Sequence, residues 1–211
     1  MLESQIATLE TVATREIEVT AEAVSDVFIP EALIYEMVEG KPIYYRGWQD
    51  VLKGEKTIEQ IMASSLIQSY LVSEINAYTH TALRKKYILG SNEAGLKFRK
   101  GDWRAADICL WTKASLKGTP LHNHYSQIIP EIVIEVDTKA DTLTIPTYYL
   151  DKTKHLHKNG VRRVLWIFTS TEQVMIAEKG QKWTIQDWSE SFEVADGFML
   201  NIKELIDAYE E

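Results

Sequence analysis

Cysteine is almost absent from this chain. Cys109 is the only one among its 211 residues. The sequence therefore cannot build a disulfide framework or a zinc site made of thiolates. A chain without disulfides suits a reducing compartment, so we expect a cytoplasmic location.

Long apolar runs and domain linkers are missing as well. No stretch approaches the ~18 consecutive apolar residues of a transmembrane helix. The first residues do not follow the basic-then-apolar pattern of a secretory signal, and we expect no association with a membrane. No linker rich in Pro, Ser or Gly divides the chain, and no segment is repeated. We therefore predict one domain over residues 30–211, preceded by an acidic arm at residues 1–29.

An excess of positive charge is the third absence. The formal net charge is −8, which argues mildly against non-specific binding of nucleic acid. The acids gather at the two ends, with seven against one base in residues 1–31 and eight against one in residues 187–211. Basic residues gather in two internal segments, 84–104 and 152–163. Either basic segment, taken alone, is explained by an ordinary solvated surface.

The strongest pattern that is present lies at residues 130–137, PEIVIEVD. A proline followed by β-branched aliphatic residues predicts a buried strand. Glu135 and Asp137 stand one period apart at its end, so we expect both to point to the same face. A carboxylate in an apolar strand is costly to bury unless a positive group meets it. A structural salt bridge and a metal ion are both open answers, and the salt bridge is the commoner one.

The rest of the chain predicts further strands and helices. A hairpin is expected at 34–45, a loop at 46–56, and a long amphipathic helix at 57–84 that begins with a capping box. After these come strands at 87–90, 95–99 and 105–111, a helix at 147–158, a strand at 161–168, a hairpin at 174–185 and a short helix at 202–209. This order predicts an α/β fold, bordering on α+β, in which helices flank a mixed β-sheet.

A second acid lies in another apolar strand. Asp107 belongs to the predicted strand 105–111 and is followed by three apolar residues. If that strand is a neighbour of strand 130–137, Asp107 and Glu135 come together, with Asp137 as a further candidate. Clustered carboxylates repel one another unless a cation neutralises them. Oxygen ligands without cysteine select Mg²⁺ or Mn²⁺.

Lys152 supplies a positive group in the predicted helix 147–158. It lies on the apolar stripe of that helix, beside two tyrosines and Leu156. Such a lysine either snorkels past the edge of the core or reaches buried carboxylates. We favour the second, and we expect Lys139, which follows the central strand, to turn into solvent. Acids, a metal and a lysine suit phosphodiester hydrolysis, because the metal activates water and neutralises phosphoryl oxygens while the ammonium stabilises the charged transition state.

Five short motifs follow one another along the chain: YEMVEGK at 35–41, ADI at 106–108, PEIVIEV at 130–136, Lys152, and NGV with LW at 159–166. In order and spacing they resemble the Uma-type restriction endonucleases of the PD-(D/E)XK nuclease superfamily, over about residues 30–170. The resemblance implies a single restriction-endonuclease-like domain in which Asp107 and Glu135 lie on neighbouring strands and bind Mg²⁺. It also implies that Lys152 is the active-site lysine, displaced from the strand to the following helix.

Three positions depart from the family pattern. Ala106 stands where a proline usually precedes the first acid, residues 137–139 (DTK) replace Ser-Pro-Ser, and Leu156 replaces a tyrosine four residues after the lysine. None of these changes removes an implied ligand. Asp137 and Lys139 nevertheless keep a second choice of acid and of lysine open.

Other residues admit other interpretations. The pairs His122/His124 and His155/His157 could form a zinc site, but i, i+2 positions on a helix diverge, and solvated histidines are the simpler interpretation. Glu36 could assist a metal from the side. A salt bridge within its own hairpin is the simpler expectation.

Two functions of different classes follow from these observations. The favoured one is a Mg²⁺-dependent endonuclease, with Mn²⁺ as the alternative ion, that hydrolyses DNA through Asp107, Glu135 and Lys152. We expect a homodimer, because cutting both strands of a duplex commonly uses two sites and twofold pairs are the commonest oligomers. The arm at 1–29 is a candidate for that contact. The alternative function is a catalytically silent protein of the same fold that acts as a binding or assembly module.

Overall fold

The computed structural model describes residues 28–210. The predicted acidic arm at 1–29 lies almost entirely outside the described residues, so its role in a dimer stays a prediction. Within the described range, every helix is too short or too polar to span a lipid bilayer. In chain order the elements are η1 (Glu31–Leu33), β1 (Ile34–Val38), β2 (Lys41–Tyr44), α2 (Trp48–Leu52), α3 (Ile58–Met62), α4 (Leu66–Leu83), β3 (Tyr87–Arg99), β4 (Asp102–Thr112), β5 (Ile132–Val136), α5 (Tyr148–Lys158), β6 (Arg163–Phe168), β7 (Gln173–Glu178), β8 (Thr184–Asp187), β9 (Phe192–Ala195), β10 (Phe198–Leu200) and α6 (Ile202–Glu210).

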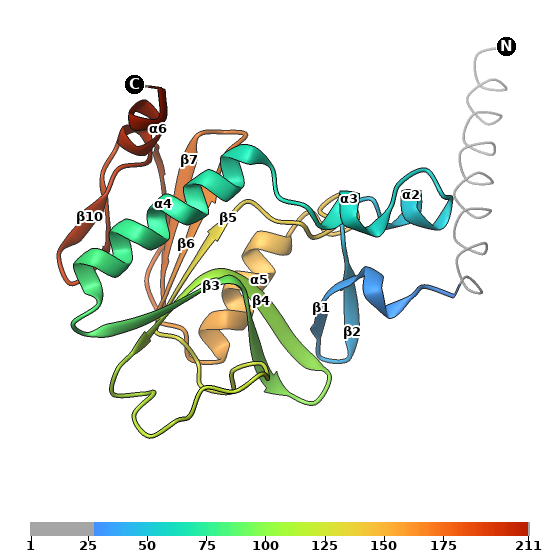
Figure 1. The fold of residues 1–211 in the computed structure, drawn as a ribbon, viewed down its shortest axis with the longest axis horizontal. Coiled ribbons are helices and arrows are strands. Elements are labelled where there is room, and N and C mark those ends of the chain that lie inside the picture. Colours follow the sequence, from blue (N-terminus) through green and yellow to red (C-terminus); the bar gives the residue numbers. More distant parts are fainter. Residues whose placement is uncertain (1–27, 211) are drawn as a thin grey trace, which may run out of the picture. The chain divides into compact units, whose positions relative to one another are not determined.

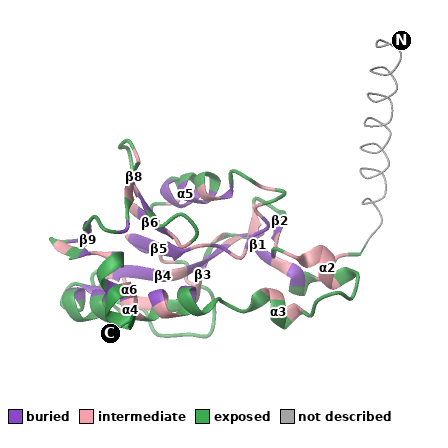
Figure 2. Ribbon diagram, turned by 90° about the horizontal axis from the view of Figure 1, so that it is seen from above, coloured by how far each residue is buried: buried purple, intermediate pink, exposed green. Residues whose placement is uncertain are grey.

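The described part of the protein contains one large sheet with helices on both faces, and a separate two-stranded sheet of β9 and β10. The strands of the large sheet follow the order β2-β1-β4-β5-β6-β7-β8, and β3 also pairs with β4. β5 and β6 are parallel, whereas the other paired neighbours are antiparallel. α5 covers one face, while α4 and α6 cover the other (Figures 1 and 2). The predicted α/β fold with a mixed sheet flanked by helices is confirmed.

β5 supplies side chains to both faces of the sheet. Ile132, Ile134 and Val136 pack on the side of α4, and Val133 packs on the side of α5. Successive side chains of a strand point to opposite faces, so Glu135 shares the face of Val133. All of β5 is buried (Figure 2), and each fully buried aliphatic side chain contributes about 1.5–3 kcal/mol. The strand is therefore fixed in the centre of the core.

β4 has an interruption along one of its edges. Its other edge pairs with β3 from residue 102 to residue 112. On the interrupted edge, β5 pairs with residues 108–110 and β1 pairs with residue 103 alone. Residues 104–107 face no strand there within the described chain. Their backbone groups on this edge need other partners, since buried N–H and C=O groups are almost always paired.

The predicted helix at 57–84 is two helices, α3 and α4. Ala63 is extended after α3, and Ser65 then caps α4 by accepting a hydrogen bond from the Gln68 backbone N–H. Serine favours caps because its hydroxyl bonds to nearby backbone groups. The predicted capping box at the start of α3 is present. The apolar periodicity therefore runs through residues 57–84, although the helix itself is interrupted between Met62 and Leu66.

The predicted loop at 46–56 contains a helical turn, α2. Trp48 begins this turn, donates its indole N–H to Asp141 Oδ2 at 3.2 Å, and packs its ring 4.8 Å from that of Tyr44. The contact with Asp141 is distant in sequence, so local pattern does not reveal it. The two short strands expected at 87–99 are one bulged strand, β3, and the β9–β10 pair was not predicted.

Candidate active site

Charged side chains satisfy the backbone where β4 has no neighbouring strand. The Ala105 N–H donates to Glu36 Oε1 at 3.1 Å, and the Ala105 carbonyl oxygen accepts from Lys152 Nζ at 2.6 Å. Beside them, the Val136 N–H of β5 donates to Asp107 Oδ2 at 2.8 Å. Side chains from β1, β4 and α5 thus meet at the interruption of the sheet.

Lys152 lies at the buried centre of this group. Tyr148 and Leu156, one turn before and after it on α5, are buried against the sheet, so Lys152 faces the same way. Its side chain is 0% exposed, and Nζ lies 2.9 Å from Glu135 Oε1 and 3.0 Å from Glu36 Oε1. Burial lowers the pKa of Lys152, but these two carboxylates outweigh burial and raise that pKa, so the ammonium is charged. The snorkelling alternative was wrong.

Glu36 does not form the expected salt bridge within its hairpin. Its carboxylate is fully buried, and its Oε2 accepts from Arg104 Nη1 at 2.6 Å and from the Tyr148 hydroxyl at 2.8 Å. Burial raises the pKa of Glu36, but Lys152 and then Arg104 outweigh burial and lower it, so the group is ionised. Sequence reasoning missed Arg104 and Tyr148. The available signal was that Glu36 and Arg104 carry opposite charges inside two apolar strands.

Asp107 and Glu135 come together on neighbouring strands. The β4–β5 register pairs Ile108 with Ile134, and one step further along it Asp107 and Glu135 fall opposite each other. Burial raises the pKa of Asp107 to about 6 and, with Asp107 nearby, that of Glu135 to about 8. In both cases burial outweighs the lowering effect of Lys152. Two desolvated carboxylates placed in this way have an unmet need for positive charge.

The donor set fits a hard divalent cation. Glu135 Oε1 is buried and makes no hydrogen bond of good geometry within the described chain, although Lys152 Nζ is 2.9 Å away. Asp107 has one oxygen engaged by the Val136 N–H. Among residues 28–210, no three Asp, Glu, His or Cys side chains are grouped as a metal site. Mg²⁺ is commonly bound by only one or two carboxylates together with water and substrate phosphates, so a two-carboxylate site is sufficient for it.

Asp137 does not join the other two acids, contrary to expectation. β5 ends at Val136, and Asp137 has a φ of 56°, in the left-handed region. The alternation of a strand therefore stops before it, and its carboxylate turns to the loop after β6. There it accepts from the backbone N–H of Thr169 at 2.9 Å and from the hydroxyl of the same residue at 2.5 Å.

Lys139 is not in solvent, which corrects a second expectation. Its side chain is only 14% exposed and pairs with Glu93 of the β3 bulge. Asn92 and Glu93 both have positive φ, 68° and 54°, a conformation that costs a non-glycine residue about 1–2 kcal/mol. Lys152, and not Lys139, is therefore the lysine beside Glu135.

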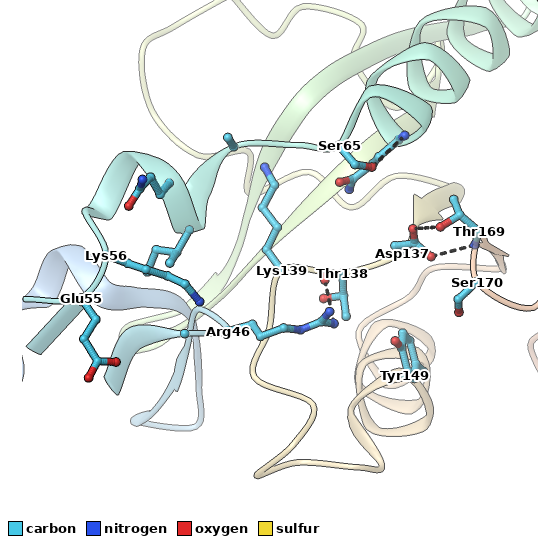
Figure 3. A pocket seen from close by; sticks show the side chains of 15 residues that line it. Arg46, Glu55, Lys56, Ser65, Asp137, Thr138, Lys139, Tyr149, Thr169 and Ser170 are labelled. Carbon is cyan, nitrogen blue, oxygen red and sulfur yellow. Dashed lines mark hydrogen bonds between the residues drawn. The ribbon is translucent and has the colours of Figure 1, made fainter. Parts of the chain in front are cut away.

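A pocket of about 740 Å³ opens at the carboxyl ends of the parallel strands β5 and β6 (Figure 3). Arg46, Lys56 and Lys139 bring positive charge to it, and Ser65 brings the N-terminal end of α4. Lys56 and Lys139 have carboxylate partners, Asp50 and Glu93. Within residues 28–210, the Arg46 guanidinium makes only long hydrogen bonds of 3.4 Å, to the Thr138 carbonyl oxygen and the Thr142 hydroxyl. Ligands of open α/β sheets commonly bind at this end of the strands.

A second pocket, of about 340 Å³, lies beside Asp107. Asp107 lines its wall, whereas Glu135 is only 2% exposed. Most of its wall is small and polar: Ser69, Ser73 and Asn76 from α4, and Ser91, Asn92 and Glu93 from β3. Glu93 lines this pocket and its partner Lys139 lines the larger one, so the ion pair stands between them.

The two histidine pairs differ in their exposure to solvent. His122 and His124 are exposed on a loop, with rings 5.8 Å apart. His155 is buried beside Asp102, and His157 is buried with Nδ1 2.9 Å from the Val161 carbonyl oxygen. The helix histidines are therefore occupied by contacts within the fold.

Comparison with solved structures finds a similar fold. The crystal structure of a putative nuclease belonging to DUF820 from Anabaena variabilis matches with a TM-score of 0.61 and 16% sequence identity, covering 82% of this chain and 89% of that chain. At this identity the likeness establishes the fold alone. No family model matches the sequence, and no curated protein matches it.

Proposed function

We propose that this protein is a divalent-cation-dependent endonuclease that hydrolyses phosphodiester bonds of DNA. The observation that carries the proposal is the meeting of Asp107 and Glu135 on adjacent strands, with Lys152 Nζ 2.9 Å from Glu135. The resemblance of the motifs to Uma-type endonucleases supports it, as does a fold shared with a protein described as a nuclease.

Asp107 and Glu135 would hold the cation, Mg²⁺ or Mn²⁺. Such an ion neutralises phosphoryl oxygens and lowers the pKa of water for attack on phosphorus. Lys152 would stabilise negative charge that develops on the phosphoryl group. Its ammonium donates a hydrogen bond to the Ala105 carbonyl oxygen and lies within 3.0 Å of oxygens of Glu135 and Glu36. If Glu135 held the cation, Lys152 would be free to face a phosphoryl oxygen on that side.

The larger pocket is our candidate for the path of the DNA backbone. Arg46 lines it and has no carboxylate partner within the described chain. A guanidinium presents a fork of donors that matches a phosphate group. The N-terminal end of α4 at Ser65 adds partial positive charge on the same side. We therefore propose a phosphate contact at Arg46, in the pocket beyond the carboxyl end of β5, the strand that carries Glu135.

Cleavage of plasmid and oligonucleotide DNA with Mg²⁺ or Mn²⁺ tests the proposal. Asp107→Asn and Glu135→Gln should each lower the rate by about a hundredfold or more, because each removes a ligand charge that offsets several kcal/mol of barrier. Asp207→Asn is the matched control, since it removes one carboxylate charge from an exposed ion pair on α6 and should leave the rate unchanged. Equal rates in all three variants would contradict the assignment.

A second candidate function is binding without cleavage. It is favoured by the complete engagement of Lys152, whose side chain is 0% exposed. A folded wild-type protein that binds DNA but releases no product with either ion would support this alternative over the first.

A homodimer stays a prediction. Light scattering at high micromolar concentration should give twice the mass of the 24.2 kDa chain. A mass of one chain under those conditions would remove the prediction.

A further inference from the structure

The Glu36 carboxylate is held in place by hydrogen bonds to both of its oxygens. Both of its oxygens are engaged: Oε1 by the Ala105 N–H at 3.1 Å, and Oε2 by Arg104 at 2.6 Å and Tyr148 at 2.8 Å. Donors from β4 and α5 thus fix the carboxylate that β1 carries. A carboxylate fixed in this way cannot follow a cation that moves, so its position defines where an ammonium beside it can sit.

Lys152 is shared almost equally between two carboxylates. Its Nζ lies 3.0 Å from Glu36 Oε1 and 2.9 Å from Glu135 Oε1. Only one of these, Glu135, lies opposite Asp107 in the sheet. A divalent cation that takes Glu135 must compete with Lys152 for it. The competition is weaker if Lys152 keeps a second carboxylate, because the ammonium then stays compensated after Glu135 is withdrawn.

We propose that Glu36 is a positioning residue that holds Lys152 and thereby leaves Glu135 available to a divalent cation. This inference rests on the proposed function, since it takes Asp107 and Glu135 as the ligands. Glu36 touches neither substrate nor ion in this account. It acts through Lys152, and Arg104 and Tyr148 act on Glu36 by fixing its second oxygen.

A charge-neutral pair of substitutions separates this role from general electrostatics. Glu36→Gln together with Arg104→Gln removes one negative and one positive charge from the same buried contact. Lys152 then pairs with Glu135 alone and competes with the ion more strongly. The Mn²⁺ dissociation constant, measured by calorimetry, should rise about tenfold, the size expected when two contacting groups are coupled. Glu178→Gln with Arg163→Gln makes the same exchange in a partly exposed pair between β6 and β7, away from Asp107 and Glu135, and should leave Mn²⁺ affinity unchanged.

The decisive arm repeats the exchange in a Lys152→Met background. With the ammonium gone, Glu36 has nothing to hold, so the double substitution should no longer change Mn²⁺ affinity. A merely structural role lowers the thermal unfolding temperature but leaves the affinity of the folded protein unaltered. Unchanged affinity in the double variant, or an equal loss with and without Lys152, would overturn the inference.

A backup variant covers failure of the double variant to fold. Glu36→Asp keeps the charge but withdraws the carboxylate from Lys152 by one methylene, and should weaken Mn²⁺ binding about threefold; unchanged affinity would overturn the inference. A wild-type protein that binds no Mn²⁺ removes the proposed function together with this inference. Binding that is lost in Asp107→Ala but insensitive to every change at Glu36 removes the inference alone.

Discussion

Two clusters of ion pairs in this protein use the same chemistry in different places. The strand-end cluster, at one end of β5, β6 and β7, joins Arg162 and Arg163 to Glu131 and Glu178, with contacts of 2.6–2.9 Å and partial exposure of all four side chains. The cluster at the interruption of β4 has contacts of 2.6–3.0 Å and is almost wholly buried. Its members are Glu36, Arg104, Lys152 and Glu135.

The difference lies in what each cluster replaces. In the strand-end cluster, Arg163 and Glu178 face each other across the paired strands β6 and β7, and the ion pairs add to a ladder that is already complete. At the interruption, Glu36 and Lys152 stand in for a strand by binding the backbone of Ala105. Removing a partner there leaves a buried charge, which costs far more than a surface charge. The two clusters therefore differ in whether their charged groups replace missing backbone hydrogen bonds, and not in which charged groups they contain.

The largest expected effect comes from removing the central cation. Lys152→Met should lower the free energy of unfolding by about 3–5 kcal/mol, because Glu36 and Glu135 lose their shared ammonium and the Ala105 carbonyl loses its donor. Urea denaturation of the wild type and the variant measures the change. A loss below about 1 kcal/mol would show that the buried cluster contributes no more to stability than a partly exposed ion pair.

A smaller effect is expected on DNA binding. Arg46→Ala should weaken binding of duplex DNA about tenfold and reduce the slope of log affinity against log salt by about 0.9, the value for one phosphate contact. Arg162→Ala is the matched control, because Arg162 is already paired with Glu131 and Glu178. Fluorescence anisotropy without divalent ions measures both. Equal losses in the two variants would show a general charge effect and no phosphate contact at Arg46.

The smallest effect belongs to the strand-end cluster. Burial raises the pKa of Glu178, but Arg163 and Arg162 outweigh burial and lower it. A carboxylate with a lowered folded-state pKa contributes stability above its unfolded pKa of about 4.3, and the contribution is lost as pH falls through the folded-state pKa.

Glu178→Gln should therefore cost about 1 kcal/mol or less at pH 7, and the difference from wild type should shrink toward zero below about pH 3. Denaturation at both pH values measures it. A gap that persists at low pH would assign the effect to packing.

The sequence predicted the parts of the site that local pattern controls. Asp107 and Glu135 stood out as acids inside apolar strands, and Lys152 as a cation on an apolar helix stripe. Their meeting depends on the β4–β5 and β5–β6 pairings, which follow from two consecutive buried strands and a crossover helix.

What the sequence could not predict arises from long-range contacts and single backbone angles. The left-handed φ of Asp137 turned it away from the acid pair. Arg104 looked like part of a basic surface until the interruption of β4 gave it a buried partner on β1. α2 exists through a contact of Trp48 with Asp141, 93 positions along the chain. Such features depend on contacts between residues far apart in the sequence and on single backbone angles, and short-range periodicity predicts neither.

The most direct test of the central claim is calorimetric titration of Mn²⁺ into wild type, Asp107→Ala and Glu135→Ala. We predict one ion bound per wild-type chain and none in either variant. Equal stoichiometry and affinity in all three proteins would contradict the claim that Asp107 and Glu135 share a cation.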